Sequence, residues 1–269
     1  MTRRSWWRPL VMHARLWRSC FAQAVRRDLQ FRSQTILNAV ASTLDLILGV
    51  VPVLVLTDSS ATASGWTGSL AVVVVGAYGV CTGLMDCFIA PNLTRIDAYV
   101  RRGDLDLILI RPVNAPLYSA LRWMEPAELG RVLTGLTLMT AAGHRAGLAP
   151  DPAVLLVSTA WASIGVAGFS LLWANLAYLA FWVESAEPIN EVAVQIREAG
   201  KYPLTYFPKP VQLLLRTLVP AGLIAAVPVE ALTSPTDGLW VAALSLAAAL
   251  AFTALHWRVA NRRYSSASS

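Results

Sequence analysis

The chain has 269 residues, of which 56% are hydrophobic and 14% charged, and its mean hydropathy is +0.53. A soluble globular domain carries about 25% charged residues, so this composition excludes disorder and collagen-like repeats and indicates lipid as the solvent for much of the chain. The net charge of +6 would suit a nucleic-acid-binding protein, but the basic residues flank apolar segments, and no nucleic-acid partner is expected. The three cysteines, Cys20, Cys81 and Cys87, predict neither a disulfide framework nor a metal site.

Residues 1–34 hold eight arginines against one acid, Asp28. The segment lacks the uninterrupted apolar core of a secretory signal peptide. Its apolar residues recur at helical spacing on one stripe: Trp7, Leu10, Ala14, Trp17, Phe21 and Ala24. We therefore expect a cytoplasmic amphipathic helix in the plane of the membrane interface, against anionic headgroups. The alternative is a helix packed on a partner protein.

Long apolar runs follow, and a helix needs about 20 such residues to cross a bilayer. They predict transmembrane spans at about 35–57, 68–90, 127–148, 153–183 and 239–257. The first two are joined by a polar turn, 58–67, that has no basic residue, and the fourth contains no charge. We expect a single transmembrane domain over 35–263 and a cytoplasmic tail at 264–269.

Arginine placement predicts the orientation, because Lys and Arg in short flanking segments stay in the cytoplasm. The N-terminal segment, the loop 92–131 and the C-terminal tail are rich in arginine. Both termini are therefore expected in the cytoplasm, which requires an even number of crossings. About six helices satisfy this if residues 186–232 supply one more.

That fifth span can be placed in two ways. Hydropathy alone favours 211–232, with 184–210 as a cytoplasmic loop. In the other interpretation 186–202 is a polar helix shielded by protein, and the proline-punctuated stretch 203–232 is a re-entrant element on the outer side. Charges in spans are tolerated when they face a bundle interior or water. Both placements keep the even number of crossings.

Three motifs then occur in order along the chain: VRRGDLDLILIRPVN at 100–114, GKYPL at 200–204 followed by Pro208, Pro220 and Pro228, and the ending YSSASS at 264–269. Together with the hydropathy frame they resemble type-2 ATP-binding-cassette (ABC) exporter permeases, and more narrowly the bacterial subfamily of paired permeases that accompany a separate ATPase. The resemblance runs from about Arg26 to the C-terminus, and it favours the re-entrant placement of 203–232.

The resemblance implies an all-α integral membrane protein in the bacterial plasma membrane. Two permease subunits, identical or paralogous, would enclose the substrate path, and two ABC ATPase (nucleotide-binding) subunits would dock from the cytoplasm. ATP and Mg would bind to those partners, and no cofactor is expected on this chain. The coupling element that contacts the ATPase would lie within about 95–112, around these residues: Arg101, Arg102, Gly103, Asp104, Leu105 and Asp106.

The chemistry of that stretch suits docking without reference to the family. Positive residues, Arg101 and Arg102, and negative residues, Asp104 and Asp106, lie beside apolar ones: Leu105, Leu107 and Leu109. Gly103 allows the chain to turn sharply after the two arginines. Such a mixed surface can bind a soluble protein while lying near lipid. The alternative is an ordinary interfacial loop whose arginines only enforce topology.

Two acids inside predicted spans, Asp45 and Asp86, are hypotheses for a substrate or proton path, Asp45 being the stronger. The alternative is that Asp45 pairs with a polar neighbour and that Asp86 lies near the cytoplasmic end. Glycines 76, 79 and 83 share a helix face and predict a close helix approach. Asn175 is expected to hydrogen-bond across helices, and His144 to lie in an outer turn.

No phosphate-cradling Gly-x-x-x-x-Gly-Lys-Ser/Thr motif and no nucleophile–base arrangement is present in the sequence. The chain is therefore not expected to be an enzyme, and the energy for transport must come from elsewhere. The sequence favours an ABC permease subunit that exports a hydrophobic or amphipathic compound, driven by ATP hydrolysis on a partner. The main alternative is a secondary transporter driven by an ion gradient acting through Asp45, and a more distant one is a membrane scaffold.

Overall fold

The computed structural model describes residues 7–64, 66–110, 118–119, 122–183, 185–234 and 237–263, and these contain helices and turns but no strand. The long helices are α1 (Trp7–Gln30), α2 (Arg32–Leu48), α3 (Val50–Ser64), α4 (Gly68–Phe88), α9 (Leu129–Arg145), α10 (Pro152–Ala177) and α14 (Leu239–Arg263). The shorter ones are α5 (Ala90–Leu93), α6 (Ile96–Arg102), α7 (Leu105–Leu109), α11 (Glu187–Glu198), α12 (Lys209–Arg216) and α13 (Ala226–Thr233). Short 3-10 turns η1 (Pro126–Glu128), η2 (Tyr178–Phe181), η3 (Ala199–Lys201) and η4 (Leu204–Tyr206) link some of them.

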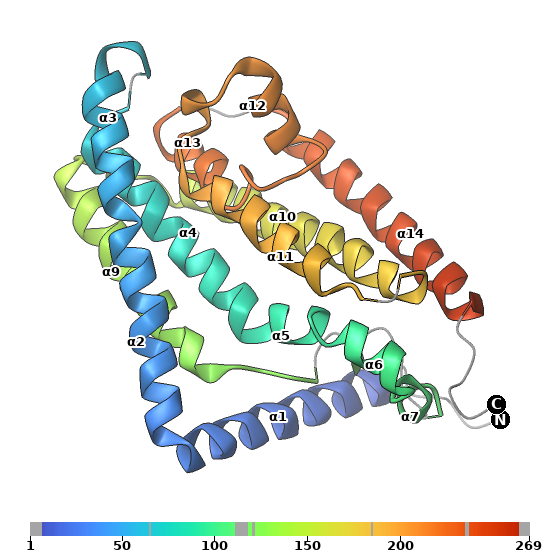
Figure 1. Cartoon of the computed structure of the whole chain (residues 1–269). Helices are drawn as coiled ribbons and strands as arrows, with labels where there is room; N and C mark the ends of the chain where they lie inside the picture. Colours follow the sequence, from blue (N-terminus) through green and yellow to red (C-terminus); the bar gives the residue numbers. More distant parts are fainter. Residues whose placement is uncertain are drawn as a thin grey trace.

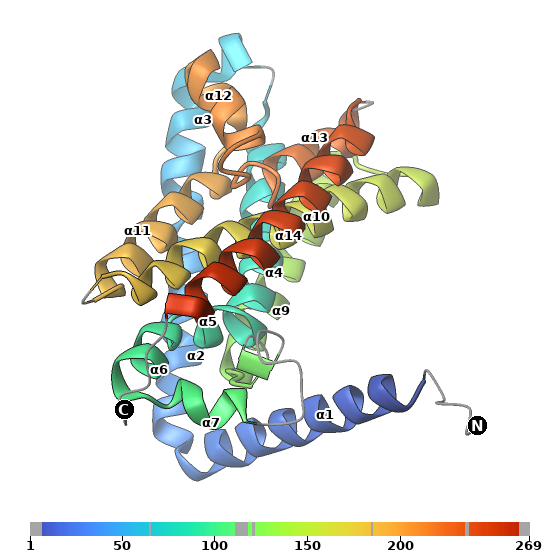
Figure 2. The ribbon, with the colours of Figure 1, turned by 90° about the vertical axis from the view of Figure 1, so that its right-hand side faces the viewer.

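Helix α1 lies across the lower end of the molecule and meets α2 at a sharp corner at Phe31 (Figures 1 and 2). Three residues of the predicted stripe face the rest of the chain: Trp17 and Phe21 pack on Phe88 at the end of α4, and Ala24 is buried. The described part of α1 therefore uses its apolar face to pack against its own domain.

The first predicted span is interrupted between α2 and α3 at Gly49. Pro52 has no N–H and its ring crowds the carbonyl of Leu48, so a continuous helix is disfavoured there. The helix then continues to Ser64, well into the stretch predicted as a polar turn, since Ala, Ser and Thr do not stop a helix before Gly65.

Helix α4 is the centre of the bundle. Of its most apolar window 72% is buried, against 11% for α2–α3, 17% for α10–η2 and 6% for α14. It crosses α9 at backbone contact: a Cβ on Gly76 would lie 2.8 Å from the Gly135 carbonyl, and one on Gly83 would lie 2.8 Å from Val132 Cγ2. The predicted close approach along the glycine face is confirmed. Gly79 faces Leu46 of α2 instead.

Four stretches in the described residues are long and apolar enough to cross a membrane: 32–57, 68–88, 152–181 and 239–263. Helix α9 has 17 residues and is about 26 Å long at 1.5 Å per residue. The count of six spans and the placement of the termini in the cytoplasm stay predictions.

Residues 187–233 form α11, α12 and α13 rather than one long helix. The stretch 211–232 is interrupted by turns around Pro220, and Pro203, Pro208 and Pro210 bound the turns before it. Helix α11 packs along α10, while α12 lies at the upper end of the molecule with the α3–α4 turn (Figures 1 and 2). The helices α1 and α6, which carry arginines, lie with α7 at the opposite, lower end.

Candidate coupling surface and buried charge network

The predicted coupling stretch folds as two short helices joined by one glycine. Helix α6 ends with Arg101 and Arg102, Gly103 adopts φ 75°, and α7 begins at Leu105. This left-handed conformation is open to glycine and strained for other residues, and it is the usual way to end a helix. The chain therefore turns at Gly103, as the sequence predicts. Residues Arg111 and Pro112, at the end of the predicted element, lie outside the described residues.

The two helices separate an inward apolar side from an outward mixed side. Leu105 and Ile108 are 2% and 1% exposed and anchor α7 to the protein. The outward side, which we call the α6–α7 surface, comprises Arg101, Arg102, Asp104, Leu107 and Ile110. Leu105, which the sequence places beside the charges, is instead buried and anchors α7. Asp106 is half-buried between the two sides.

Asp97, a residue that sequence reasoning did not single out, connects this surface to α11. Its side chain is 5% exposed. It forms an ion pair with Arg101, whose Nε donates at 2.8 Å, and it accepts a hydrogen bond from the buried backbone N–H of Ala186 at 3.0 Å. Ala186 precedes the first residue of α11. The position of α6 is thus fixed relative to the start of α11.

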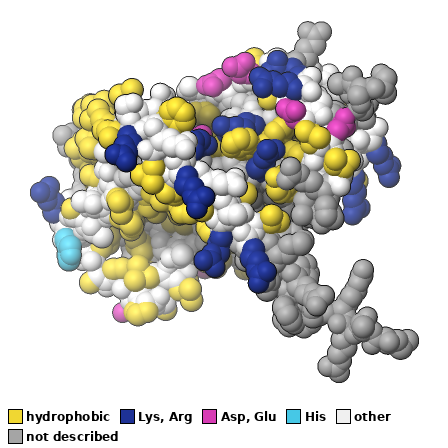
Figure 3. Space-filling model, turned by 90° about the horizontal axis from the view of Figure 1, so that it is seen from below, with side chains coloured by type: hydrophobic (Ala, Val, Ile, Leu, Met, Phe, Trp, Pro, Cys, Tyr) yellow, Lys and Arg dark blue, Asp and Glu magenta, His cyan; other side chains and the backbone are white. Residues whose placement is uncertain are grey.

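The segment that begins at Arg122 is held against α5 and the start of α6. The Asn92 side chain accepts from the Trp123 backbone N–H and donates to the Trp123 carbonyl, both at 2.7 Å. Two guanidinium groups stack on the Trp123 ring, that of Arg95 at 4.7 Å and that of Arg122 at 5.1 Å. Seen from below, the molecule carries Lys and Arg side chains spread among hydrophobic ones (Figure 3).

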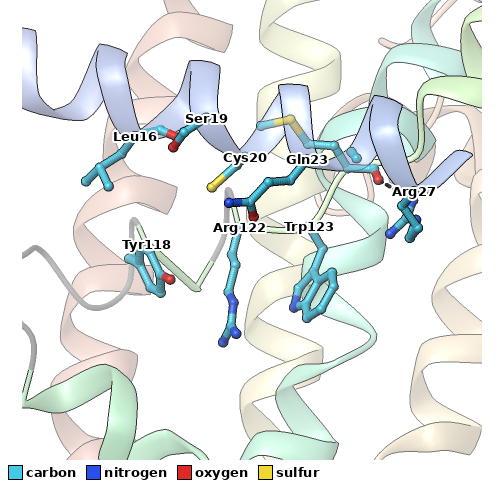
Figure 4. Close-up of a pocket in the computed structure, with 10 residues that line it drawn as sticks. Leu16, Ser19, Cys20, Gln23, Arg27, Tyr118, Arg122 and Trp123 are labelled. Atoms are coloured by element: carbon cyan, nitrogen blue, oxygen red, sulfur yellow. Dashed lines mark hydrogen bonds between the residues drawn. The ribbon is translucent and has the colours of Figure 1, made fainter. Parts of the chain in front are cut away.

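A cavity of about 510 Å³ lies between α1 and this segment. Leu16, Ser19, Cys20 and Gln23 line it from α1, and Tyr118, Arg122 and Trp123 line it from the other side, although the last two side chains point away from α1 (Figure 4). Arg27 closes one end by donating to the Met124 carbonyl at 2.9 Å. No carboxylate or imidazole is among the described lining residues, so the cavity offers no acid–base pair.

Inside the bundle, Asp86 of α4 forms a bidentate ion pair with Arg197 of α11. The two Nη atoms of Arg197 donate to the two carboxylate oxygens, the longer contact being 3.1 Å. Arg197 is 4% exposed and its guanidinium lies 5.5 Å from the centre of the Trp173 ring. Trp173 in turn donates to Asn190 of α11 at 3.0 Å. A charge in a low-dielectric interior needs such a partner, which accounts for the presence of Arg197 on the buried side of α11.

A second set of contacts continues this network toward α2. Tyr78 of α4 donates to Glu198 at 3.0 Å, and Glu198 also pairs with Lys201. The Arg131 guanidinium of α9 lies 5.9 Å from the Tyr78 ring and donates to Asp45 of α2 at 3.1 Å. We call the seven residues of the two sets the charge network: Asp45, Tyr78, Asp86, Arg131, Arg197, Glu198 and Lys201.

Asp45 differs from the rest of the charge network in exposure. Its side chain is 61% exposed, whereas that of its partner Arg131 is 8% exposed. Its neighbours on the open face of α2–α3 are apolar: Val40, Leu44, Ile47, Leu48 and Val51. A carboxylate at this position avoids lipid only if water or another protein surface covers it. The ion pair with Arg131 confirms the alternative expectation that Asp45 pairs with a polar neighbour. A role for Asp45 in a substrate or proton path stays a prediction.

The remaining expectations have simple outcomes. Asn175 donates to Thr253 at 2.7 Å and its Oδ1 lies 2.8 Å from His256 Nδ1, so it does bridge α10 and α14. His144 is exposed at the end of α9. Cys81 and Cys87 are buried and Cys20 is half-buried, all three as free thiols. The described residues contain no cluster of three or more side chains able to hold a metal ion.

Sequence reasoning missed the partners Arg131, Arg197 and Glu198, together with Asp97. A signal was present, since Asp45 and Asp86 are isolated acids in predicted spans and Arg131 is a base within another. Opposite charges isolated in apolar surroundings tend to pair. That signal does not say which base meets which acid.

The family model described as ABC-2 family transporter protein matches residues 44–268. No curated protein and no solved structure matched the sequence. The matched region contains the α6–α7 surface. It also includes all seven residues of the charge network. The chain therefore belongs to the ABC-2 family of transporter membrane proteins.

Proposed function

We propose that this chain is the membrane-spanning permease subunit of an ABC exporter that moves a hydrophobic or amphipathic compound outward. Membership of the ABC-2 family supports a multi-pass membrane component of an ABC transporter that associates with an ATPase subunit. ATP and Mg bind to that partner, and this chain converts the partner's movement into alternating access. A second permease subunit completes the path, and the complex lies in the bacterial plasma membrane.

The observation that carries the proposal is the α6–α7 surface. It combines exposed charges of both signs with two exposed apolar side chains, Leu107 at 58% and Ile110 at 78%. Interfaces are built from such an apolar centre with a polar rim. Because Leu105 and Ile108 anchor α7, a partner that presses on this surface moves the transmembrane bundle rather than a loose loop.

The open face of α2–α3 supports a second permease subunit. A carboxylate exposed among apolar residues near the centre of a membrane costs about 2.5–3.5 kcal/mol or more. Covering Asp45 with a partner surface or a water-lined path removes that cost. The same face would then line the route of the substrate.

The test is purification of the complex from its native membrane, with mass spectrometry of the co-purifying chains. We expect an ATP-hydrolysing subunit. The Arg102→Glu variant should lower its recovery about tenfold or more, because like charges facing each other cost several kcal/mol and 1.4 kcal/mol is a factor of ten. Arg102 suits this test because Arg101 also pairs with the buried Asp97.

Arg263→Glu is the matched control, since Arg263 is also exposed, in the last turn of α14, and belongs to no ion pair among the described residues. Equal recovery of the ATPase with Arg102→Glu and with the control would remove the α6–α7 surface from the interface. Proton-coupled transport by this chain alone in liposomes would instead establish a secondary transporter.

A further inference from the structure

Helix α11 is attached at both ends to other elements and is open along one side. At its start, Ala186 donates its buried N–H to Asp97 of α6, 89 residues away in the sequence. At its end, Arg197 and Glu198 contact Asp86 and Tyr78 of α4. The 12 residues between these ends span about 18 Å at 1.5 Å per residue.

The attachment of the α11 start depends on Asp97. The residue before the helix, Ala186, has no side chain able to cap it, and the first turn contains Pro188. The Ala186 N–H is buried, and an unsatisfied buried donor is costly. A charged acceptor makes a stronger hydrogen bond than a neutral one. Asp97 also pairs with Arg101, which lies on the α6–α7 surface.

The far end of α11 has the components of a second arrangement. The Nε atoms of Arg131 and Arg197 and one carboxylate oxygen of Glu128 are buried without a hydrogen-bond partner among the described residues. Two free donors and one free acceptor lie beside ion pairs that would have to change partners if α11 shifted along α4. Packed interfaces with alternative pairings switch between discrete states rather than deform continuously.

We propose that Asp97 is a positioning residue that makes α11 follow the α6–α7 surface. When the ATPase subunit displaces α6, Asp97 carries the start of α11 with it, and the other end moves against α4 at the Asp86–Arg197 pair. The proposal rests on the proposed function, because it assigns the route by which docking at the α6–α7 surface reaches the transmembrane bundle.

The experiment places a single reporter thiol at one of two exposed positions, Leu107→Cys on α7 or Gln195→Cys on α11, in the complex purified with its ATPase. Cys20→Ser removes the half-buried native thiol, and Cys81 and Cys87 are buried. The rate of reaction with a maleimide is measured with and without ATP, Mg and vanadate. With Asp97 intact we expect the rate to change at least twofold at both reporters.

With Asp97→Ala we expect the change at the α7 reporter to persist and the change at the α11 reporter to disappear. Asp97→Asn keeps one acceptor oxygen for Ala186 and should retain a reduced change at α11. Ser185→Ala is the matched control, because the Ser185 hydroxyl accepts from the Glu187 N–H at the same helix start, whereas Asp97 accepts from Ala186. It should leave both changes intact.

An α11 response as large in Asp97→Ala as in the parent would overturn the proposal, and so would loss at both reporters, which would make Asp97 part of the docking element alone. If Asp97→Ala fails to fold, an undiminished α11 response in Asp97→Asn is the contradicting result. Failure of the proposed function would give a different result. In that case no ATPase co-purifies with the parent, and nucleotide changes the maleimide reaction rate at neither reporter.

Discussion

At the scale of single residues, the charge network is held by two arginines with different surroundings. The side chain of Arg197 is 5% exposed and that of its partner Asp86 is 18% exposed, so both members of this pair are largely removed from solvent. Arg131 faces Asp45, which is 61% exposed. Removing one partner of a buried ion pair leaves an uncompensated charge, and this costs far more than loss of a solvent-accessible one.

The first prediction concerns the buried pair. Asp86→Asn leaves the Arg197 guanidinium without its counter-charge and should lower the free energy of unfolding by about 3 kcal/mol or more. Adding Arg197→Gln should recover part of the loss. The measurement is thermal denaturation of the purified protein in detergent. Asp151→Asn, at an exposed acid before α10, is the control, and an equal shift for both acids would contradict the prediction.

The second prediction concerns the exposed pair. Asp45→Asn should lower the free energy of unfolding by about 1 kcal/mol or less in the same measurement, because the Asp45 carboxylate is exposed. In addition, Arg131 stays within electrostatic range of Glu128 and Glu198. The larger effect of Asp45→Asn should be on transport, if a water-lined path covers Asp45. A loss of stability as great as that of Asp86→Asn would show that Asp45 is buried in the assembled protein.

At the scale of elements, the crossing of α4 and α9 depends on glycine at both partners. A Cβ on Gly135 would lie 2.7 Å from the Gly76 carbonyl oxygen and from the Val80 nitrogen, both backbone atoms that cannot rotate away. Small residues permit helix axes to approach this closely where the surrounding solvent is lipid. The two helices must separate if either glycine gains a side chain.

The third prediction follows from that geometry. Gly135→Ala should destabilise the protein by about 1–3 kcal/mol, the usual cost of inserting atoms into a packed interior. Gly143→Ala is the matched control on the same helix, where the new Cβ would lie 3.9 Å from Leu148 Cδ1. Because alanine is the better helix former, the control should be neutral or stabilising by about 0.4–1 kcal/mol. Equal melting temperatures would place the α4–α9 contact elsewhere.

These elements also show what could be predicted from the sequence. Uninterrupted apolar runs predicted the helices α4 and α10, glycine spacing predicted a close helix approach at α4 without naming its partner, and Gly103 predicted the turn between α6 and α7. Each of those signals is local. The pairs Asp45–Arg131, Asp86–Arg197 and Tyr78–Glu198 join residues 86, 111 and 120 positions apart. Which helices become neighbours is a property of packing, so the charge network could not be read from residue spacing.

At the scale of the whole molecule, apolar surface is unevenly distributed. Helix α4 is buried, while α2–α3 and α14 present most of their surface outward. The two open faces differ in one respect: α2 carries the exposed carboxylate of Asp45, whereas no ionisable residue occurs in 239–255 of α14. Lipid alone can cover the α14 face, but a carboxylate is unstable against lipid.

The fourth prediction is therefore that the second permease subunit covers α2 and that lipid covers α14. In a Cys20→Ser background, Leu44→Cys and Leu250→Cys provide matched reporters, because the native side chains are 50% and 53% exposed. A photoreactive benzophenone maleimide attached at position 44 in native membranes should capture another permease chain, and the mass of the adduct separates an identical copy from a paralogue. The same probe at position 250 should capture lipid. Capture of a permease chain at 250 and none at 44 would move the subunit interface to α14 and leave Asp45 to be covered by water.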